Sequence, residues 1–296
     1  MKNILNKIFE VAIWIDELIK TSSTWKIEEK NSSWDTQAKL DVLSDVFVEK
    51  KLKELTEIKS IVSEEKEEIV EVNSTWKYLI AYDPLDWSSL IDVDLSVWTI
   101  FGIYENDFNW KDLVASCYIV YWPRVEIVFA DEKWVKFFRL IPSLVSPHSI
   151  SPKGREKEQF SELKIENLKN KWKIISPWAK NNEWPEYHKN IINNFWEQWY
   201  KLRYSWWMVP DLHQILLKRW WLFTYPETTD NKNWKLRKLF EVFPFVFIFE
   251  KLWGHAIDKN WTRILDLWYK NLHEPTSCYF GSNWEIEEVK NFLTNK

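Results

Sequence analysis

The sequence predicts a layered α/β fold, and three observations support this class. Apolar residues recur with helical spacing near the N-terminus, strand-like apolar runs dominate the middle of the chain, and both patterns alternate afterwards. Strands mixed with helices throughout a chain indicate packed layers of sheet and helix. The 296 residues, 46% of them hydrophobic, suffice for one large domain or two ordinary ones.

Two helices are expected first. Residues 3–20 carry apolar side chains at a helical spacing, a polar loop follows at 21–36, and a second helix is predicted over about 38–55. The stretch "SIVSEEKEEIV" (60–70) then predicts a short apolar strand before a cluster of glutamates.

Strands and helices follow in a mixed order. The apolar runs predict strands at 78–82, 97–104, 113–121, 125–130 and 134–140. Residues 149–171 are polar and charged, which indicates a linker, and we expect two domains, 1–168 and 169–296. The second domain is expected to hold strands at 172–176 and 222–225 and helices at 186–197, 211–218, 242–251 and 284–294.

The composition excludes several classes of protein. A net charge of -4 argues against a nucleic-acid binder, which would be basic. We find no apolar run of about 18 residues, so no membrane span is expected, and no N-terminal pattern of a signal peptide. Cys117 and Cys278 give no disulfide framework and no metal-binding spacing. The expectation is a reduced, cytoplasmic protein without nucleic-acid or membrane partners.

Tryptophan and glycine occur in unusual numbers, 23 and 4 respectively. Ordinary usage of about 7% would give roughly 20 glycines. Many tryptophans follow or precede Asn, Asp or Ser, as in "DWS" (86–88) and "SNW" (282–284), which is the neighbourhood of glycine in turns. We hypothesise that most of them are glycines in the native protein, encoded by UGA and translated as Trp. The alternative is a truly Trp-rich protein.

Acidic residues cluster where strands are expected to end. Each pair alone is weak evidence, because Asp-x-x-Asp is often a turn or helix cap and Glu-Glu is usually a solvated surface. The order is more informative: an acidic pair, a strand, "DPLD" (83–86), a turn residue and Ser88–Ser89. Hard oxygen ligands of this kind suit Mg²⁺. With glycine at 87, the backbone N–H groups of 87–89 could approach a phosphate closely.

Several long motifs resemble those of one enzyme family. With glycine at 87 and 98, "DPLDWSSLIDVDLSVWTIFGIY" (83–104) resembles the signature of class I fructose-1,6-bisphosphatase. Further matching segments follow in the family's order. They are "WDTQAKLDVLSD" (34–45), "IVSEE" (61–65), "LRYSWWMVPDLHQIL" (202–216), "LFTYP" (222–226), "KLRKLFEVFP" (235–244) and "RILDL" (263–267). The resemblance implies the layered αβαβα sugar-phosphatase fold.

The resemblance also implies a metal site of two to three Mg²⁺ ions per subunit, with Mn²⁺ as a substitute. Its ligands would be Asp35, Glu64, Asp83, the carbonyl of Leu85, Asp86 and Glu241. Asp41 and Glu65 would activate the attacking water, with Asp35 counted in the same catalytic set. By default, Glu241 would only place charge at a helix N-terminus.

The substrate contacts implied by the resemblance fall into two groups. Ser88 and Ser89 would hold the 1-phosphate, with Arg237 nearby. The sugar and the 6-phosphate would contact Asn182, Tyr204, Met208, Tyr225 and Lys235. Arg203 would reach into a neighbouring subunit, which implies a homo-oligomer, expected to be a tetramer. Without the resemblance, Tyr225 and Met208 would be expected in the core, and Lys235 and Arg237 in solvent.

Some positions depart from the family's pattern. The asparagine after Ser-Ser is Leu90 here, and Pro185 stands where a phosphate-binding tyrosine is expected, for which Tyr187 is a substitute candidate. Lys232 is a candidate for a second basic residue. Glu105 replaces an AMP-binding arginine, so weak or no inhibition by AMP is expected.

The expected function is Mg²⁺-dependent hydrolysis of the 1-phosphate of fructose 1,6-bisphosphate, a step of gluconeogenesis. Sedoheptulose 1,7-bisphosphate is the closest alternative substrate, and an inositol-phosphatase-like activity is a more distant one. A non-catalytic sugar-phosphate sensor would need a lost metal ligand, and none is lost.

Overall fold

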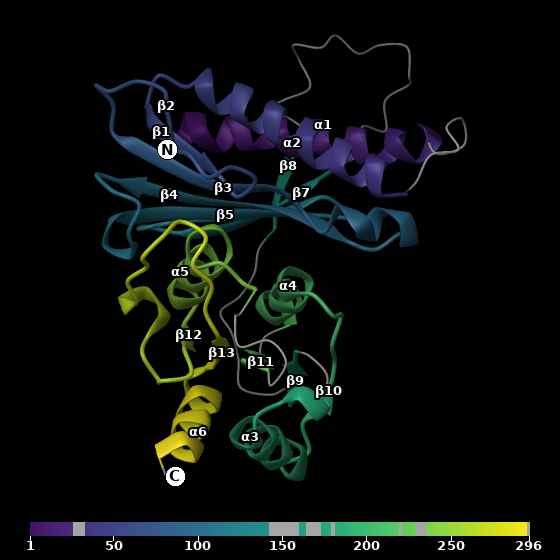
Figure 1. Ribbon diagram of the computed structural model, residues 1–296, viewed down its shortest axis with the longest axis vertical. Helices are drawn as coiled ribbons and strands as arrows, with labels where there is room; N and C mark the ends of the chain where they lie inside the picture. The colour runs from purple at the N-terminus through teal and green to yellow at the C-terminus, as the bar shows by residue number, and fades with distance from the viewer. Residues whose placement is uncertain are drawn as a thin grey trace. The chain divides into compact units, whose positions relative to one another are not determined.

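The computed structural model describes residues 1–25, 33–141, 160–163, 173–178, 181–218, 221–228 and 235–294. The chain divides into two compact units (Figure 1). Unit 1 consists of Met1–Phe108 and Asp112–Lys164, and unit 2 of Asn109–Lys111 and Ile165–Lys296.

Unit 1 is built on an eight-stranded sheet with the order β2-β1-β3-β4-β5-β6-β7-β8. The strands are β1 (Ile58–Ser63), β2 (Val70–Glu71), β3 (Tyr78–Asp86), β4 (Val97–Glu105), β5 (Leu113–Tyr121), β6 (Glu126–Asp131), β7 (Val135–Leu140) and β8 (Phe160–Leu163). Strands β1 and β3 pair in parallel, and each of the other neighbouring pairs is antiparallel. The carboxyl ends of β1 and β3 therefore lie at the same edge of the sheet.

Two long helices, α1 (Lys2–Trp25) and α2 (Ser33–Lys53), cover one face of this sheet (Figure 1). The apolar positions that predicted the first helix are buried: Ile4, Ile8, Ala12 and Ile15 have no exposed surface. Helix α2 begins at Ser33, earlier than the expected 38, so that the aspartates of "WDTQAKLD" lie on the helix.

Unit 2 holds a five-stranded sheet with the order β10-β9-β11-β13-β12. The strands are β9 (Ile174–Pro177), β10 (Lys201–Leu202), β11 (Trp221–Tyr225), β12 (Gly254–Ile257) and β13 (Cys278–Ser282). Strand β9 is parallel to β10 and β11, and β13 is antiparallel to β11 and β12. The sequence analysis missed β10, β12 and β13, and it placed β8 in a linker, because these short strands lack a clear alternation.

Helices lie on both faces of the second sheet. Leu222 and Tyr279 face α3 (Glu186–Glu197) and α6 (Asn283–Thr294), with which they form one apolar core. The next residue along β13, Phe280, points to the other face and meets Phe249 of α5 (Phe243–Lys251) edge to face, at 5.1 Å between ring centroids. Helix α4 (Met208–Lys218) contacts β11 (Figure 1).

The expected α/β class is confirmed, with two sheets covered by helices. Several elements match their expected bounds, including β5 and α3. Among the described helices, none combines the length and the apolar character that a membrane crossing requires.

Left-handed backbone occurs where the sequence places tryptophan. Of the eight described residues other than glycine with positive φ, six are tryptophans, and no described glycine has positive φ. These tryptophans are Trp87, Trp122, Trp199, Trp206, Trp253 and Trp261, with φ between 62° and 80°. A side chain with a Cβ is disfavoured there, whereas glycine adopts this conformation freely.

Candidate active site

The acidic pair follows the end of β1 at the point where Asp83 lies in the neighbouring strand β3. Ser63 at the end of β1 pairs with Tyr82 of β3, and the next residues along the two strands are Glu64 and Asp83. The backbone N–H of Glu64 donates to the Tyr82 carbonyl over 2.9 Å. Parallel pairing of β1 and β3 thus brings together carboxylates that are far apart in the sequence.

A buried aspartate fixes the loop that carries the acidic pair. Asp45 on α2 accepts a hydrogen bond from the Tyr82 hydroxyl at 3.0 Å and forms an ion pair with Lys66 at 2.7 Å. Lys66 also pairs with Glu49. Because Lys66 directly follows Glu65, this network ties the acidic loop to α2. The sequence analysis did not anticipate Asp45 or Lys66, since their pairing depends on the packing of α2 against the sheet.

Asp41, on α2, lies next to the same cluster. Burial raises the pKa of Asp41 to about 6; the hydrogen bond to Ser88 opposes this shift, and the charge of Glu65 adds to it. Its Oδ1 atom is buried and has no hydrogen-bond partner among the residues that the structure describes. Asp41 therefore lies close to both Glu65, its expected catalytic partner, and Ser88, an expected phosphate contact.

The turn after β3 has the conformation of an anion-binding loop. Trp87, with φ 62° and ψ 42°, precedes a short 3₁₀ helix, Ser88–Val93, and its carbonyl accepts the N–H of Leu90 over 2.9 Å. Ser88 is buried and Ser89 is half-buried. Asp86 accepts a hydrogen bond from the Trp98 indole at Oδ2 over 2.8 Å. The Trp98 contact was not anticipated, because the resemblance puts glycine at this position.

Unit 1 offers carboxylate oxygens, the type of donor that a hard divalent cation prefers. Asp41 Oδ1 is buried without a hydrogen bond, and like charges gather beside it, an arrangement that a cation would stabilise. As the side chains stand, no three histidine, cysteine or acidic groups in the described part of the chain lie close enough to hold an ion.

The individual ligand candidates of unit 1 differ in their surroundings. Asp86 accepts the hydrogen bond from the Trp98 indole. The backbone of Asp35 lies on α2, and its side chain is outside the described set. Leu85 is buried, and its only oxygen is that of the backbone carbonyl.

The second group of candidates lies in unit 2. The exposed Arg203 follows β10 and donates its N–H to the Ile175 carbonyl over 3.0 Å. Tyr204 lies beside Trp206, with ring centroids 5.8 Å apart. Met208, which is 4% exposed, begins α4. The loop between β10 and α4 thus presents Arg203 and Tyr204 next to each other.

Tyr225 and Asn182 lie on neighbouring segments of unit 2. Tyr225 ends β11 and stacks on Trp178, with 4.2 Å between ring centroids. The exposed Asn182 lies in a 3₁₀ turn, Asn181–Glu183, just before Pro185 and α3. The substitute candidate Tyr187 packs against the core of unit 2, and its hydroxyl oxygen is buried. The hydroxyl of Tyr187 therefore does not replace the missing phosphate-binding tyrosine.

Glu241 lies in a π-helical turn, Lys238–Val242, and is 5% exposed. Its carboxylate accepts the backbone N–H of Arg237 over 2.6 Å. This hydrogen bond connects the two candidate residues within one turn. Lys235 is exposed and Arg237 is half-buried. Without the resemblance, Glu241 was expected only to place charge at the start of a helix, and this turn was not expected. The resemblance alone pointed to Glu241 as a candidate metal ligand. Lys232 lies outside the described residues.

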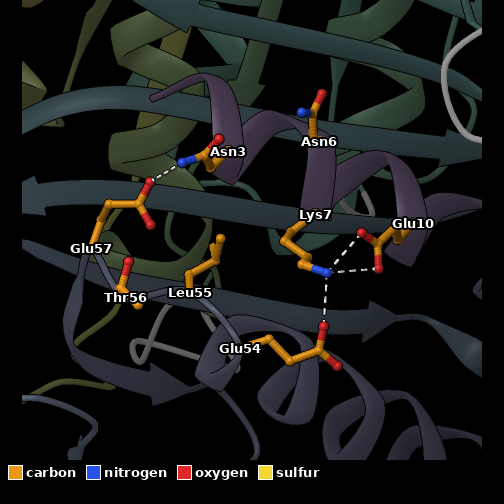
Figure 2. A pocket seen from close by; sticks show the side chains of 8 residues that line it. All are labelled: Asn3, Asn6, Lys7, Glu10, Glu54, Leu55, Thr56 and Glu57. Atoms are coloured by element: carbon orange, nitrogen blue, oxygen red, sulfur yellow. Dashed lines mark hydrogen bonds and ion pairs between the residues drawn. The ribbon is translucent and has the colours of Figure 1, made fainter.

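A separate polar pocket of about 330 Å³ lies at the start of α1, in unit 1. Figure 2 shows Lys7 between Glu10 and Glu54, at 2.8 Å and 2.7 Å, and Asn3 donating to Glu57 at 2.5 Å. These four charged side chains and Asn3 bind one another, so they join α1 to the turn after α2.

The chain is similar to known proteins along nearly its whole length. The family models described as the N-terminal and C-terminal domains of fructose-1-6-bisphosphatase match residues 1–146 and 168–294. The chain is 41% identical to the class 1 fructose-1,6-bisphosphatase of Campylobacter concisus, over 100% of this chain and 99% of that protein. It is 44% identical to that of Helicobacter hepaticus, over 97% of each.

A solved structure is similar as well. The holo form of Leishmania major fructose-1,6-bisphosphatase superposes with a TM-score of 0.83 at 28% identity, covering 99% of this chain and 93% of the other. Both halves of the chain match the same family, and the matches extend over nearly all of its length. The chain therefore belongs to the class 1 fructose-1,6-bisphosphatase family.

Proposed function

We propose that this protein hydrolyses the 1-phosphate of fructose 1,6-bisphosphate with the aid of Mg²⁺, releasing fructose 6-phosphate. The observation that carries the proposal is the group of carboxylates in unit 1, where Glu64 follows β1 beside Asp83 of the parallel strand β3 and Asp41 contacts Ser88. The relatives are named for this activity. Gluconeogenesis in the cytoplasm is the corresponding metabolic setting.

Each acidic side chain has a distinct role in the proposed reaction. Glu64, Asp83, Asp86, Glu241, Asp35 and the Leu85 carbonyl would hold two to three metal ions. Bound Mg²⁺ neutralises phosphate charge and acidifies a coordinated water. Asp41 and Glu65 would accept the proton of the attacking water, a role that their mutual proximity supports. Mn²⁺ offers the same coordination chemistry and is expected to substitute.

The phosphates and the sugar are bound by neutral and cationic groups. Ser88, Ser89 and the backbone N–H groups of the turn would orient the 1-phosphate, and the Arg237 guanidinium would contact it with a planar fork. In unit 2, Lys235 and Asn182 are exposed on the surface. Together with Tyr204, Met208 and Tyr225, they would hold the sugar and the 6-phosphate. The exposed Arg203 would bind the 6-phosphate of a neighbouring subunit in a homotetramer.

One observation favours sedoheptulose 1,7-bisphosphate as a second substrate. Pro185 stands where the resemblance expects a phosphate-binding tyrosine, and the hydroxyl of Tyr187 is buried. Fewer fixed donors around the far phosphate would tolerate a longer sugar. Relative kcat/KM values for the two bisphosphates would measure this preference.

The decisive experiment is phosphate release from fructose 1,6-bisphosphate by the protein purified from its native source, with Mg²⁺ and then with excess EDTA. We expect release that EDTA abolishes and that added Mg²⁺ restores. A folded protein that releases no phosphate with either Mg²⁺ or Mn²⁺ would refute the proposal.

We also propose that the six left-handed tryptophans are glycines in the native protein. Trp at these positions combines a disfavoured backbone with exposed apolar surface: Trp199 and Trp253 are 83% and 72% exposed. Glycine would remove the strain, and at position 87 it would open the turn to a phosphate. The backbone argument does not cover Trp98, which is extended in β4 and buried.

Peptide mass spectrometry of the protein from its native source tests this proposal. Peptides spanning residues 87 and 199 should have the mass of glycine at these positions. The mass of tryptophan at either position would contradict it. The same protein made with glycine at the six positions should unfold at a higher temperature than the sequence as written.

A further inference from the structure

Asp211 is a buried carboxylate in unit 2 with no exposed surface, one turn into α4. Its Oδ2 atom accepts the hydroxyl of Ser176 on β9 over 2.5 Å. Its Oδ1 and Oδ2 atoms also accept the backbone N–H of Ser205, at 2.9 Å and 3.2 Å. One side chain therefore joins a strand, a loop and a helix.

The segments that Asp211 joins carry substrate candidates. Ser205 directly follows Arg203 and Tyr204, and Met208 begins the helix on which Asp211 lies. Ser176 lies two residues before Trp178, which stacks on Tyr225. The Ser205 bond thus lies next to Arg203 and Tyr204, and the bond from the Ser176 hydroxyl lies two residues before the stacking partner of Tyr225.

The carboxylate of Asp211 is held by hydrogen bonds from uncharged groups. Its donors, which include the Gln214 amide at 3.2 Å, are all uncharged. Burial raises the pKa of Asp211 to about 6, while the bonds from Ser176 and Ser205 oppose that shift. Keeping a buried charge without a cation is costly, so a neutral residue would serve packing alone better.

The loop that Asp211 holds needs such support. Trp206 has φ 80°, so the chain reverses through a left-handed residue right after Ser205. A turn of this kind persists only when surrounding contacts define it. The residue at position 206, tryptophan or glycine, does not itself fix the direction of Arg203 and Tyr204.

We propose that Asp211 is a positioning residue for recognition of the 6-phosphate: by binding the Ser205 N–H and Ser176, it sets the loop that presents Arg203 and Tyr204. This inference rests on the proposed function. Asp211 does not touch the substrate, and its role is to keep these two side chains ready for the phosphate before it arrives.

The test measures fructose 6-phosphate binding by calorimetry, together with KM and kcat for fructose 1,6-bisphosphate. Asp211→Ala should weaken fructose 6-phosphate binding and raise KM by about tenfold, the effect of losing hydrogen bonds to a charged group. The kcat should change by less than about threefold, because the acidic cluster of unit 1 is untouched. Asp211→Asn keeps an oxygen acceptor for Ser205 and should restore most of the binding.

Glu285 provides a matched control in the same unit. It is 2% exposed and accepts the hydroxyl of Tyr200 over 2.9 Å, on the opposite face of the sheet. Glu285→Gln should lower the melting temperature without changing KM. If Asp211→Ala does not fold, Ser176→Ala removes one donor alone and should raise KM by about threefold.

Two results would overturn the proposal. One is a wild-type KM and wild-type fructose 6-phosphate binding in the Asp211 and Ser176 variants despite a lower melting temperature. The other is an equal loss of binding in Glu285→Gln. If the wild-type protein binds fructose 6-phosphate but releases no phosphate from the bisphosphate, the proposed reaction is wrong, and the binding data still decide the role of Asp211.

Discussion

The indole N–H of Trp98 donates to Asp86 Oδ2 over 2.8 Å, so a candidate metal ligand is held by a neighbouring strand. The contact joins β4 to the end of β3, where Asp86 pairs with Trp98 across the two strands. A metal bound to this oxygen would share it with the indole N–H and so compete with the hydrogen bond, which uses one of its lone pairs.

Removing this donor is therefore expected to favour metal binding. A hydrogen bond to a charged group contributes about 1.5–3 kcal/mol, so Trp98→Phe should lower the Mg²⁺ concentration for half-maximal activity by about tenfold or more. The measurement is phosphate release against Mg²⁺ concentration. Trp184→Phe, which removes an indole donor to the Trp178 carbonyl in unit 2, is the control and should leave the Mg²⁺ requirement unchanged. A higher Mg²⁺ requirement in Trp98→Phe would contradict the expectation.

Loss of a proton-accepting carboxylate should reduce turnover. Asp41→Asn and Glu65→Gln each keep the size of the side chain and are expected to lower kcat by about 10²–10⁴-fold, the usual contribution of a general base. The KM should change far less. Glu67→Gln, on the same acidic stretch, is the control for a general effect of charge. Wild-type turnover in Asp41→Asn would remove this residue from the mechanism.

Acid should destabilise unit 2 through His188. This ring is fully buried, with Nδ1 3.2 Å from the Tyr279 hydroxyl and Nε2 3.3 Å from Thr224 Oγ1, and burial lowers its pKa to about 3. The unfolded chain has the ordinary value of about 6.5. The stabilisation is therefore complete above pH 6.5 and is lost as the pH falls toward 3, by roughly 1 kcal/mol per pH unit.

Melting temperatures between pH 8 and pH 5 measure this effect. The difference between wild type and His188→Gln should shrink as the pH falls, because glutamine does not titrate. A constant difference across this range would show that His188 stays neutral in both states or that its pKa is not lowered.

AMP is expected to have little effect on activity. Lys77 forms an ion pair with Glu105 at 2.5 Å, which occupies a cation that an AMP phosphate would otherwise meet, and the carboxylate of Glu105 repels that phosphate. Activity measured with and without micromolar AMP should be equal. Inhibition at micromolar AMP would refute this expectation.

Local patterns predicted the long elements well and the short ones poorly. Helix α3 and strand β5 occur at their expected bounds, because apolar periodicity over nine or more residues is a strong local signal. Strands β12 and β13 have four and five residues and depend on pairing with distant segments. A pattern read along the chain carries no information on such pairing.

The candidate site shows the same division. The carboxylates of "EE" and "DPLD" were evident from their order in the sequence, whereas Glu241 required the family resemblance. The Asp45–Lys66 pair, the Trp98–Asp86 contact and the buried Asp211 network could not be anticipated, because each depends on tertiary packing.

The order of the two units along the chain bears on how the protein is made. Apart from Asn109–Lys111, unit 1 precedes unit 2, and its acidic cluster lies within the first half of the chain. N-terminal domains generally fold first during translation. The nascent polypeptide is therefore expected to assemble its carboxylates while the segments that recognise the sugar are still being synthesised on the ribosome. Cellular Mg²⁺ would then neutralise the carboxylates of unit 1 in the growing chain before any substrate could bind to it.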